Sequence, residues 1–445
     1  MAKKTVLAVL LALVLTLTFV ACTGNDYAFE ALKENPQASD AVLGGQGIAM
    51  QKGEYTYFVN GTTSYSGENK FGSVVKGGIA RIKTAAIGTE DAKVEIVVPK
   101  IIYSADASSY GFAMFGDKIY YASPSVNVDK NGYTQSSHLD FWQVNLDGTG
   151  TVKLFTLESN SVAFAWMQSA EGKVSLHYVE GSSLKVYDVV KNETTEISKQ
   201  VSSYAYDKAN GATYFAETVV GKDFQGNDVT RNFNVLKKAD AAGTVSVLLR
   251  GAAEDADQSV YGDVYSVVRA QNKNVYFTLS NSATLAGGTY VLKDGETAAQ
   301  KLAETAISSF LPYGDGIVYY DSTSGCITVL SQGAAGQQLR QVTVPEGSSV
   351  TFSAIVGDVL YYVYSNAMYT ADLTVTRTAS VKITESNLSA STATPVLLDG
   401  KVYYFNSTGS PSGYLYVAEK DGKKIKETRI ALLTKEDAKA EEESK

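Results

Sequence analysis

The chain has 445 residues, of which 44% are hydrophobic and 19% charged, so it can bury a large core and wholesale disorder is excluded. A net charge of −8 argues against nucleic acid as a partner, because phosphate recognition needs a basic patch. Two cysteines provide no disulfide framework, and 29 tyrosines beside 16 phenylalanines favour strands over helices.

The N-terminal residues have the layout of an export signal. Met1 to Lys4 carries two positive charges, and an apolar run from Thr5 to Val20 follows, as is typical of a secretory signal peptide. The run is shorter than the roughly 20 residues that a membrane-spanning helix needs. Polar residues follow it at once, so we expect this segment to be removed rather than retained.

The residues around the expected cleavage site resemble the bacterial lipobox, which ends in the cysteine that receives diacylglycerol. Val20, Ala21 and Cys22 match this motif, whereas Phe19 stands where leucine is usual. The resemblance implies a lipoprotein cut before Cys22 and held at the extracytoplasmic face of the cell membrane by palmitate-like acyl chains. Each buried CH₂ of such chains contributes about 0.8 kcal/mol to anchoring. The alternative is a secreted protein with a chance cysteine at this position.

A turn followed by an aromatic-rich strand recurs eight times along the rest of the chain. The last three spacings between the aromatic anchors are 43, 42 and 42 residues. Periods in the forties, with several strands in each, are typical of propeller blades. The eight anchors are Tyr57, Tyr121, Tyr178, Phe215, Phe277, Tyr320, Tyr362 and Tyr404.

The same order of strands follows within each copy. Asp147-Gly148 and Asp421-Gly422 each join two alternating runs, and Asp-Gly is a strong hairpin signal because both residues tolerate positive φ. Another strand precedes each anchor, as at residues 110–115, so one copy corresponds to one four-stranded blade.

We therefore predict an all-β protein, a β-propeller of four-stranded antiparallel blades. Eight blades are preferred, with seven as the alternative, because the third copy is short and has His177 in place of its first aromatic residue. A β-solenoid has much shorter repeats, and a pair of sandwiches would not repeat one strand order eight times.

The anchor strands support a family resemblance. Residues 357–362 combine Gly and Asp with the apolar pair Val359-Leu360 and Tyr-Tyr, residues 399–404 have Lys401-Val402 between Asp-Gly and Tyr-Tyr, and Asp147-Gly148-Thr149 follows another such strand. This pattern resembles bacterial lipoprotein propeller repeats, which are similar to the YWTD propeller of low-density lipoprotein receptors. The resemblance covers residues 45–433 and brings no catalytic residue set. It implies a binding or scaffolding module.

The chain is thus divided into four parts. We expect a signal peptide at residues 1–21, and a lipidated N-terminus with a flexible tether at 22–44. The propeller follows at 45–433. Residues 434–445 are a charged tail, expected to be disordered or a frayed helix because they offer no apolar face.

No catalytic or metal-binding motif is recognisable in the sequence. His138 and His177 fall in different copies without clustered carboxylates, so they do not form a zinc motif. His177 is expected to be a packed substitute for an aromatic residue, and Cys326 a buried, inert thiol. We therefore predict no catalytic residues, no metal ligands and no cofactor.

Long connections follow the aromatic strand in four copies, at residues 60–76, 124–138, 218–232 and 280–288. In a four-stranded blade these connections lie on the face where the chain crosses between blades, so they should share one rim. Loops on a rigid scaffold often carry recognition residues, and tyrosine offers contact area at low entropic cost. Tolerated surface insertions are the alternative. The candidate ligand-binding residues of this rim are Tyr65, Phe71, Tyr133, His138 and Phe224.

These observations favour a non-enzymatic, monomeric binding or scaffolding module. Its expected partners are membrane lipid, through Cys22, and an unidentified protein, peptide or glycan, with nucleic acid excluded. The alternative is a glycan-directed hydrolase or lyase with carboxylates at the propeller channel, because propeller enzymes assemble their sites from distant blades. Convergent acids at the channel mouth would favour the enzyme.

Overall fold

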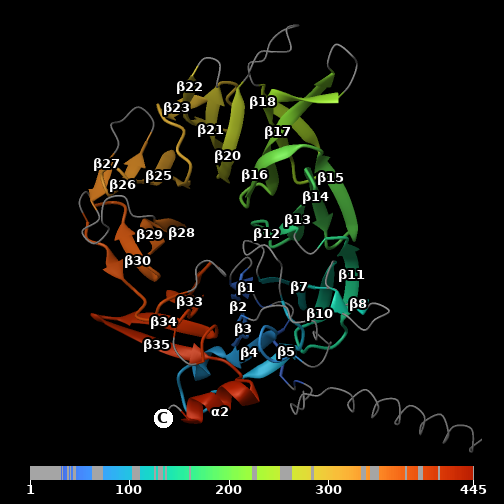
Figure 1. Cartoon of the computed structure of the whole chain (residues 1–445), viewed down its shortest axis with the longest axis vertical. Helices are drawn as coiled ribbons and strands as arrows, with labels where there is room; N and C mark the ends of the chain where they lie inside the picture. The colour runs from blue at the N-terminus through green and yellow to red at the C-terminus, as the bar shows by residue number, and fades with distance from the viewer. Residues whose placement is uncertain are drawn as a thin grey trace, which may run out of the picture.

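The computed structural model describes residues 32, 34–37, 40, 42–43, 47–62, 74–102, 111–124, 127–128, 134–135, 138–159, 162–222, 228–250, 263–281, 285–331, 337–340, 350–375, 378–388, 394–408 and 411–443. Eight antiparallel sheets follow one another along these residues and stand around a common centre as the blades of a β-propeller (Figure 1). The predicted fold and the count of eight blades are confirmed.

Blades 1 to 4 occupy the first half of the ring. A small two-stranded hairpin is inserted between the second and third strands of blade 2, and a short 3-10 helix, η1 (Thr84–Ala86), precedes the last strand of blade 1. Blade 1 contains β1 (Val42–Leu43), β2 (Ala49–Lys52), β3 (Tyr55–Val59), β4 (Ile79–Lys83) and β5 (Glu95–Val98). Blade 2 contains β6 (Phe112–Phe115), β7 (Lys118–Pro124), β10 (Leu139–Asn145) and β11 (Val152–Leu157), with β8 (Asn127–Val128) and β9 (Thr134–Gln135) as the added hairpin. Blade 3 contains β12 (Ala163–Gln168), β13 (Val174–Glu180), β14 (Ser183–Asp188) and β15 (Glu193–Ser198), and blade 4 contains β16 (Val201–Asp207), β17 (Ala212–Lys222), β18 (Asp228–Ala239) and β19 (Val245–Arg250).

Blades 5 to 8 complete the ring, and one α-helix, α2 (Lys435–Glu443), follows the last strand. Blade 5 contains β20 (Val264–Gln271), β21 (Asn274–Asn281), β22 (Ala286–Leu292) and β23 (Gln300–Ala303), and blade 6 contains β24 (Phe310–Tyr313), β25 (Gly316–Asp321), β26 (Cys326–Leu330) and β27 (Gln337–Arg340). Blade 7 contains β28 (Thr351–Val356), β29 (Val359–Tyr364), β30 (Ala367–Asp372) and β31 (Val381–Lys382), and blade 8 contains β32 (Val396–Leu398), β33 (Lys401–Phe405), β34 (Leu415–Asp421) and β35 (Lys424–Ile430).

The aromatic anchors occupy equivalent places in the blades. Each lies on the second strand of its sheet, except in blade 1, where β1 adds a strand before the usual first one. Seven of the eight anchors are at most 3% exposed, and the eighth, Tyr320, is partly buried. The second strand is covered on both sides by neighbouring blades, so large aromatic side chains there bury most of their surface.

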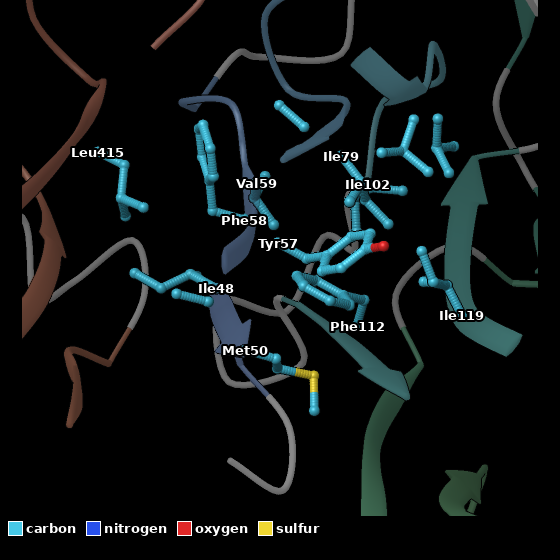
Figure 2. Close-up of a cluster of buried hydrophobic side chains, with 14 of the residues drawn as sticks. Ile48, Met50, Tyr57, Phe58, Val59, Ile79, Ile102, Phe112, Ile119 and Leu415 are labelled. Carbon is cyan, nitrogen blue, oxygen red and sulfur yellow. The ribbon is translucent and has the colours of Figure 1, made fainter. Parts of the chain in front are cut away.

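The hydrophobic core is divided among the joints between neighbouring blades. Each joint from blade 2 to blade 8 has its own cluster of buried side chains. At the joint of blades 2 and 3, for example, the rings of Phe141 and Phe164 meet edge to face, with centroids 5.2 Å apart. The largest cluster joins blades 8, 1 and 2, and Figure 2 shows Tyr57 between Phe112 of blade 2 and other residues of blade 1. Every blade therefore depends on its neighbours for burial.

The ring closes through side chains and loops, because blades 1 and 8 are separate sheets. Asn60, fully buried after β3, donates from Nδ2 to the carbonyl of Leu432 at 2.8 Å and accepts from the Leu432 amide at 3.0 Å. The same Nδ2 reaches the carbonyl of Val75 at 3.0 Å. The amide of Thr62 donates to the carbonyl of Gly413 at 2.7 Å. One asparagine thus joins segments that lie 372 positions apart.

Replacing Asn60 with Ala should lower the free energy of unfolding by about 2–3 kcal/mol, because buried backbone groups of Leu432 and Val75 lose their partner. Urea unfolding would measure the change. Thr408→Ala, at an exposed position on blade 8, is the control and should change stability by less than about 0.5 kcal/mol. An equally small effect for Asn60→Ala would contradict this role in closure.

His177 confirms the third blade as a packed unit. It lies on β13, is 1% exposed, and its ring stacks on Tyr204 at 6.2 Å between centroids. Its Nε2 lies 2.7 Å from the hydroxyl of Thr213 in blade 4. Burial lowers the pKa of His177 to about 3. The histidine therefore packs as an aromatic residue, as predicted.

The low pKa of His177 makes stability depend on pH. In the unfolded chain His177 takes up a proton near its ordinary pKa of 6.5, whereas in the folded chain it does so only when the pH falls to about 3. The stability that the neutral side chain contributes is therefore fully present above about pH 6.5 and is lost as the pH falls toward the folded pKa. Between pH 7.5 and 5, the wild type should lose about 2 kcal/mol more than His177→Phe. Equal losses in chemical unfolding of the two proteins would show that His177 is not the titrating group.

Candidate functional site

The antiparallel blades give the ring two unlike faces. On one face lie the connections between first and second strands and between third and fourth strands; we call it the turn face. On the other lie the second-to-third connections and the crossings between blades; we call it the loop face. The predicted Asp-Gly turns lie on the turn face, and Gly148 and Gly422 have φ of 80° and 60°, which glycine adopts without strain.

All four connections expected from the sequence join second to third strands, so all four belong to the loop face. The one expected at residues 280–288 is short, because β21 runs to Asn281 and β22 begins at Ala286. The connection of blade 1 runs from β3 to β4, and that of blade 2 contains the β8–β9 hairpin. In blade 4 the strands themselves continue: β17 has 11 residues and β18 has 12, and they pair out to Lys222 and Asp228. The blade 4 hairpin therefore projects from the loop face.

One of the five predicted rim residues lies in the described part of the chain. His138 precedes β10 on the loop face, and its Nε2 lies 2.7 Å from Oε2 of Glu158, which follows β11. The side chain of His138 is 25% exposed and that of Glu158 is 86% exposed. Tyr65, Phe71, Tyr133 and Phe224 lie outside the described residues, as does Cys22.

A polar cluster at the base of the blade 4 hairpin links blades 3 and 4. The hydroxyl of Ser198, at the end of β15, donates to Oε2 of Glu217 on β17 at 2.7 Å. Lys237 on β18 pairs with the other carboxylate oxygen of Glu217, and both side chains are 22% exposed. Because the charges of Glu217 and Lys237 compensate one another, the base of the hairpin is held without a net charge.

The same base is tied to blade 5. Asn234 is 2% exposed and donates from Nδ2 to the hydroxyl of Thr218 at 3.0 Å. Its backbone amide donates to the carbonyl of Asp263 at 2.9 Å, and Asn281 donates to the Asp263 carboxylate at 3.1 Å. Polar groups from three blades thus fix the hairpin at its base, a feature that no local sequence motif signalled.

The C-terminal helix occupies another part of the loop face. It belongs to the segment expected from the sequence as a charged tail. The buried Tyr414, just before β34, donates its hydroxyl proton to Asp437 of α2, and Arg429 pairs with Glu441 of α2 at 2.7 Å. Lys76 of blade 1 lies over the ring of Tyr414, 4.5 Å from its centroid. The chain itself therefore covers the loop face at the joint of blades 8 and 1.

The remaining features considered in the sequence are the free cysteine, metal sites and membrane-spanning segments. Cys326 is 2% exposed within blade 6, as expected of an inert thiol. Among the described residues, no group of three or more His, Cys, Asp or Glu side chains is placed to hold a metal ion. Within the same ranges, no helix has the length and hydrophobicity needed to cross a bilayer.

Comparisons with known proteins identify no family for this chain. No family model matches the sequence, and no curated protein matches it. Among solved structures, dipeptidyl peptidase 4 of Porphyromonas gingivalis is 11% identical with a TM-score of 0.49, over 93% of this chain and 62% of its own length. Oligogalacturonate lyase of Vibrio parahaemolyticus is 12% identical with a TM-score of 0.41, over 86% and 99% respectively. AztD of Citrobacter koseri is 12% identical with a TM-score of 0.40, over 80% and 92%.

At these identities and TM-scores the likenesses carry no argument about activity. The class of the protein is defined by its own strand order, which is that of an eight-bladed β-propeller. A function for the chain has to be argued from its own residues.

Proposed function

We propose that this chain is a lipid-anchored, extracytoplasmic lipoprotein whose propeller acts as a non-enzymatic binding or scaffolding module through its loop face. The observation that carries the proposal is that the long β3–β4 and β7–β10 connections and the projecting blade 4 hairpin lie on one face of the ring. The opposite face carries tight turns, such as those at Gly148 and Gly422, and two longer connections, between β4 and β5 and between β30 and β31. This asymmetry is expected of a scaffold that presents recognition loops on one side.

The base of the blade 4 hairpin supports a role in recognition. Ser198, Glu217 and Lys237 join it to blade 3, and Asn234 joins it to Asp263 of blade 5. A projecting hairpin that is fixed at its base loses little conformational entropy when a partner binds, and such preorganisation increases affinity.

We further propose kinship with the bacterial lipoprotein propellers that are similar to the YWTD propeller. Support comes from the Tyr-Tyr pairs of the anchor strands, such as Tyr361-Tyr362 on β29 and Tyr403-Tyr404 on β33. In both pairs the second tyrosine is at most 1% exposed at a joint between blades. The repeated residues of the pattern therefore serve the packing of the fold.

The anchor is tested at Cys22. Cys22→Ser should move the protein from the membrane to the soluble fraction, because the residue that would carry the acyl chains is lost. Cys326→Ser is the matched control, since its thiol is buried within blade 6, and this variant should stay with the membrane. Retention of Cys22→Ser in membranes, or a mature N-terminus without acyl mass in the wild type, would refute the lipoprotein proposal.

The binding role is tested by capture from the cell envelope. The soluble chain from Thr23 onward and a variant with shortened loop-face connections would be used side by side. A partner retained by the first protein and lost by the second supports the proposal. A partner retained equally by both would contradict it.

A further inference from the structure

The N-terminal end of the described chain is fixed to the turn face of blade 1. Glu34 accepts a hydrogen bond from the hydroxyl of Tyr55 at 2.9 Å and pairs with Lys83 at 2.6 Å. Nζ of Lys52 donates to the carbonyl of Asp40 at 2.7 Å. Lys52 and Tyr55 flank the turn between β2 and β3, which belongs to the turn face. Residues 34–37 and Asp40 therefore lie at that face of the ring.

From there the chain runs along the inner edge of blade 1. Strand β1 pairs antiparallel with β2, Val42 opposite Lys52 and Leu43 opposite Gln51, and Figure 1 shows β1 nearer the centre of the ring than β5. The buried guanidinium of Arg81 holds the approach in place by donating to Asn35 at 2.8 Å. The chain thus enters at the turn face and reaches the loop face only where β2 begins, at Ala49.

The length of chain before Glu34 limits where an anchor can lie. Glu34 comes twelve positions after Cys22, so whatever its conformation this segment spans at most ~40 Å. As a flexible coil it would average roughly 20 Å. The usual four strands of blade 1 have four or five residues and are ~13–17 Å long, and passing outward over two strands adds ~10 Å. A path from Glu34 around blade 1 to the loop face would therefore exceed the average reach of the segment and use more than half of its extended length, before any further distance to the bilayer.

Charge at the turn face does not favour either orientation strongly. The β34–β35 turn of blade 8 exposes Lys423 and Lys424, while Glu90 and Asp91 are exposed on the β4–β5 connection of blade 1. Other turns of the same face expose Asp315, Asp358 and Asp399, so charge does not attract this face to an anionic lipid surface. The orientation of the ring on the membrane is therefore argued from the length of the N-terminal segment and from the face at which it enters the ring.

We infer that the anchored protein turns its turn face toward the bilayer and its loop face toward the water. The inference rests on the proposed lipid anchor and on the proposed role of the loop face. It deepens that role by giving the direction of approach: a partner reaches the loop face from the aqueous side. A partner embedded in the same bilayer would face the wrong side of the ring.

Reporter dyes on single introduced cysteines can measure this orientation. The native thiols do not interfere, because Cys22 would carry lipid and Cys326 is buried. Lys423→Cys and Thr408→Cys form a pair on the turn face and loop face of blade 8. The acylated variants would be placed in vesicles that contain an acceptor-labelled lipid, and energy transfer would be measured.

A second pair on the far side of the ring separates orientation from tilt. Glu171→Cys and Ser182→Cys are exposed on the turn face and loop face of blade 3. In both pairs, energy transfer to the acceptor lipid should be at least about twofold more efficient from the turn-face dye than from the loop-face dye. The reason is that the heights of the two dyes above the bilayer differ by roughly one strand length, ~20 Å. Equal transfer within both pairs, or stronger transfer from the loop-face dyes, would overturn the inference.

A longer tether provides the matched control. Inserting about 20 Gly and Ser residues after Thr23 should raise the average end-to-end distance of the segment before Glu34 to roughly 30 Å. The difference in energy transfer between the two dyes of each pair should then become smaller. An undiminished difference would show that something other than the tether orients the ring and would overturn the argument from length. Vesicle association and N-terminal acyl mass are recorded for every variant. Failure of all variants to associate would refute the anchor itself, an outcome distinct from wrong orientation on the membrane.

Discussion

Shortening the blade 1 connection and the blade 4 hairpin on the loop face should weaken partner binding by more than about tenfold, which corresponds to about 1.4 kcal/mol. The blade 4 variant replaces residues 219–233 with an Asn-Gly turn, because Thr218 and Asn234 already pair across β17 and β18. The blade 1 variant replaces residues 63–73 with a short Gly/Asn linker and keeps the contacts of Asn60. Stability should change by only about 1 kcal/mol, since loop-closure cost varies slowly with length.

The turn face supplies the control for these variants. Glu171 and Lys173 pair with each other at 3.1 Å and are more than 70% exposed, so replacing both with Ala alters that face without touching the core. Affinity should be unchanged in this control. Unchanged affinity in both loop variants, with melting preserved, would move the site to the turn face or the channel and would raise the glycan-directed enzyme above the binding module.

Ending the chain before Pro395 should abolish cooperative folding, because it removes blade 8 from a ring whose blades bury their surfaces only against neighbours. Tyr403, Phe405 and Leu415 are at most 2% exposed in the cluster that joins blade 8 to blade 1. Burial of each such side chain contributes about 1.5–3 kcal/mol, so their loss alone approaches the 5–15 kcal/mol that stabilises a typical domain. Light scattering and size-exclusion chromatography should show aggregation.

A shorter truncation tests whether the blade or the C-terminal helix is responsible. Ending the chain after Thr434 removes α2 but keeps every strand of blade 8. This protein should remain a soluble monomer with one cooperative transition, although it loses the pairs of Arg429 with Glu441 and of Tyr414 with Asp437. The same behaviour from the chain that ends before Pro395 would indicate independent domains and contradict the closed ring.

Much of the fold could be predicted because its signals are local. The aromatic anchors mark the second strand of each blade, and Asp-Gly pairs such as Asp421-Gly422 mark turns. The third blade forms despite His177, because a buried neutral imidazole packs against Tyr204 much as a phenyl ring would. The two-residue β1 is too short to leave a periodic signal, and its pairing with β2 depends on contacts made elsewhere.

Helix α2 shows where local reasoning ends. Its residues have no apolar face, so the sequence indicates a solvated tail. The described helix is held by polar contacts with blade 8, from Tyr414 to Asp437 and from Arg429 to Glu441. These partners are 23 and 12 positions apart, beyond the range of a helical pattern.

The candidate site could be predicted only in part. Strand order alone places the long connections on one face, and the structure confirms that placement. The hydrogen bonds between Ser198 and Glu217 and between His138 and Glu158 join residues that lie 19 and 20 positions apart, so no local pattern predicts them. The assignment of Tyr65, Phe71, Tyr133 and Phe224 to a binding rim stays a prediction.

Amide hydrogen exchange with and without the captured partner tests the central claim most directly. If the loop face binds the partner, peptides that cover residues 60–78, 125–138 and 219–233 should exchange more slowly in the complex. The β12–β13 and β34–β35 turns on the opposite face should exchange at the same rate in both states. Slower exchange at those turns, with no change at the long connections, would contradict the account.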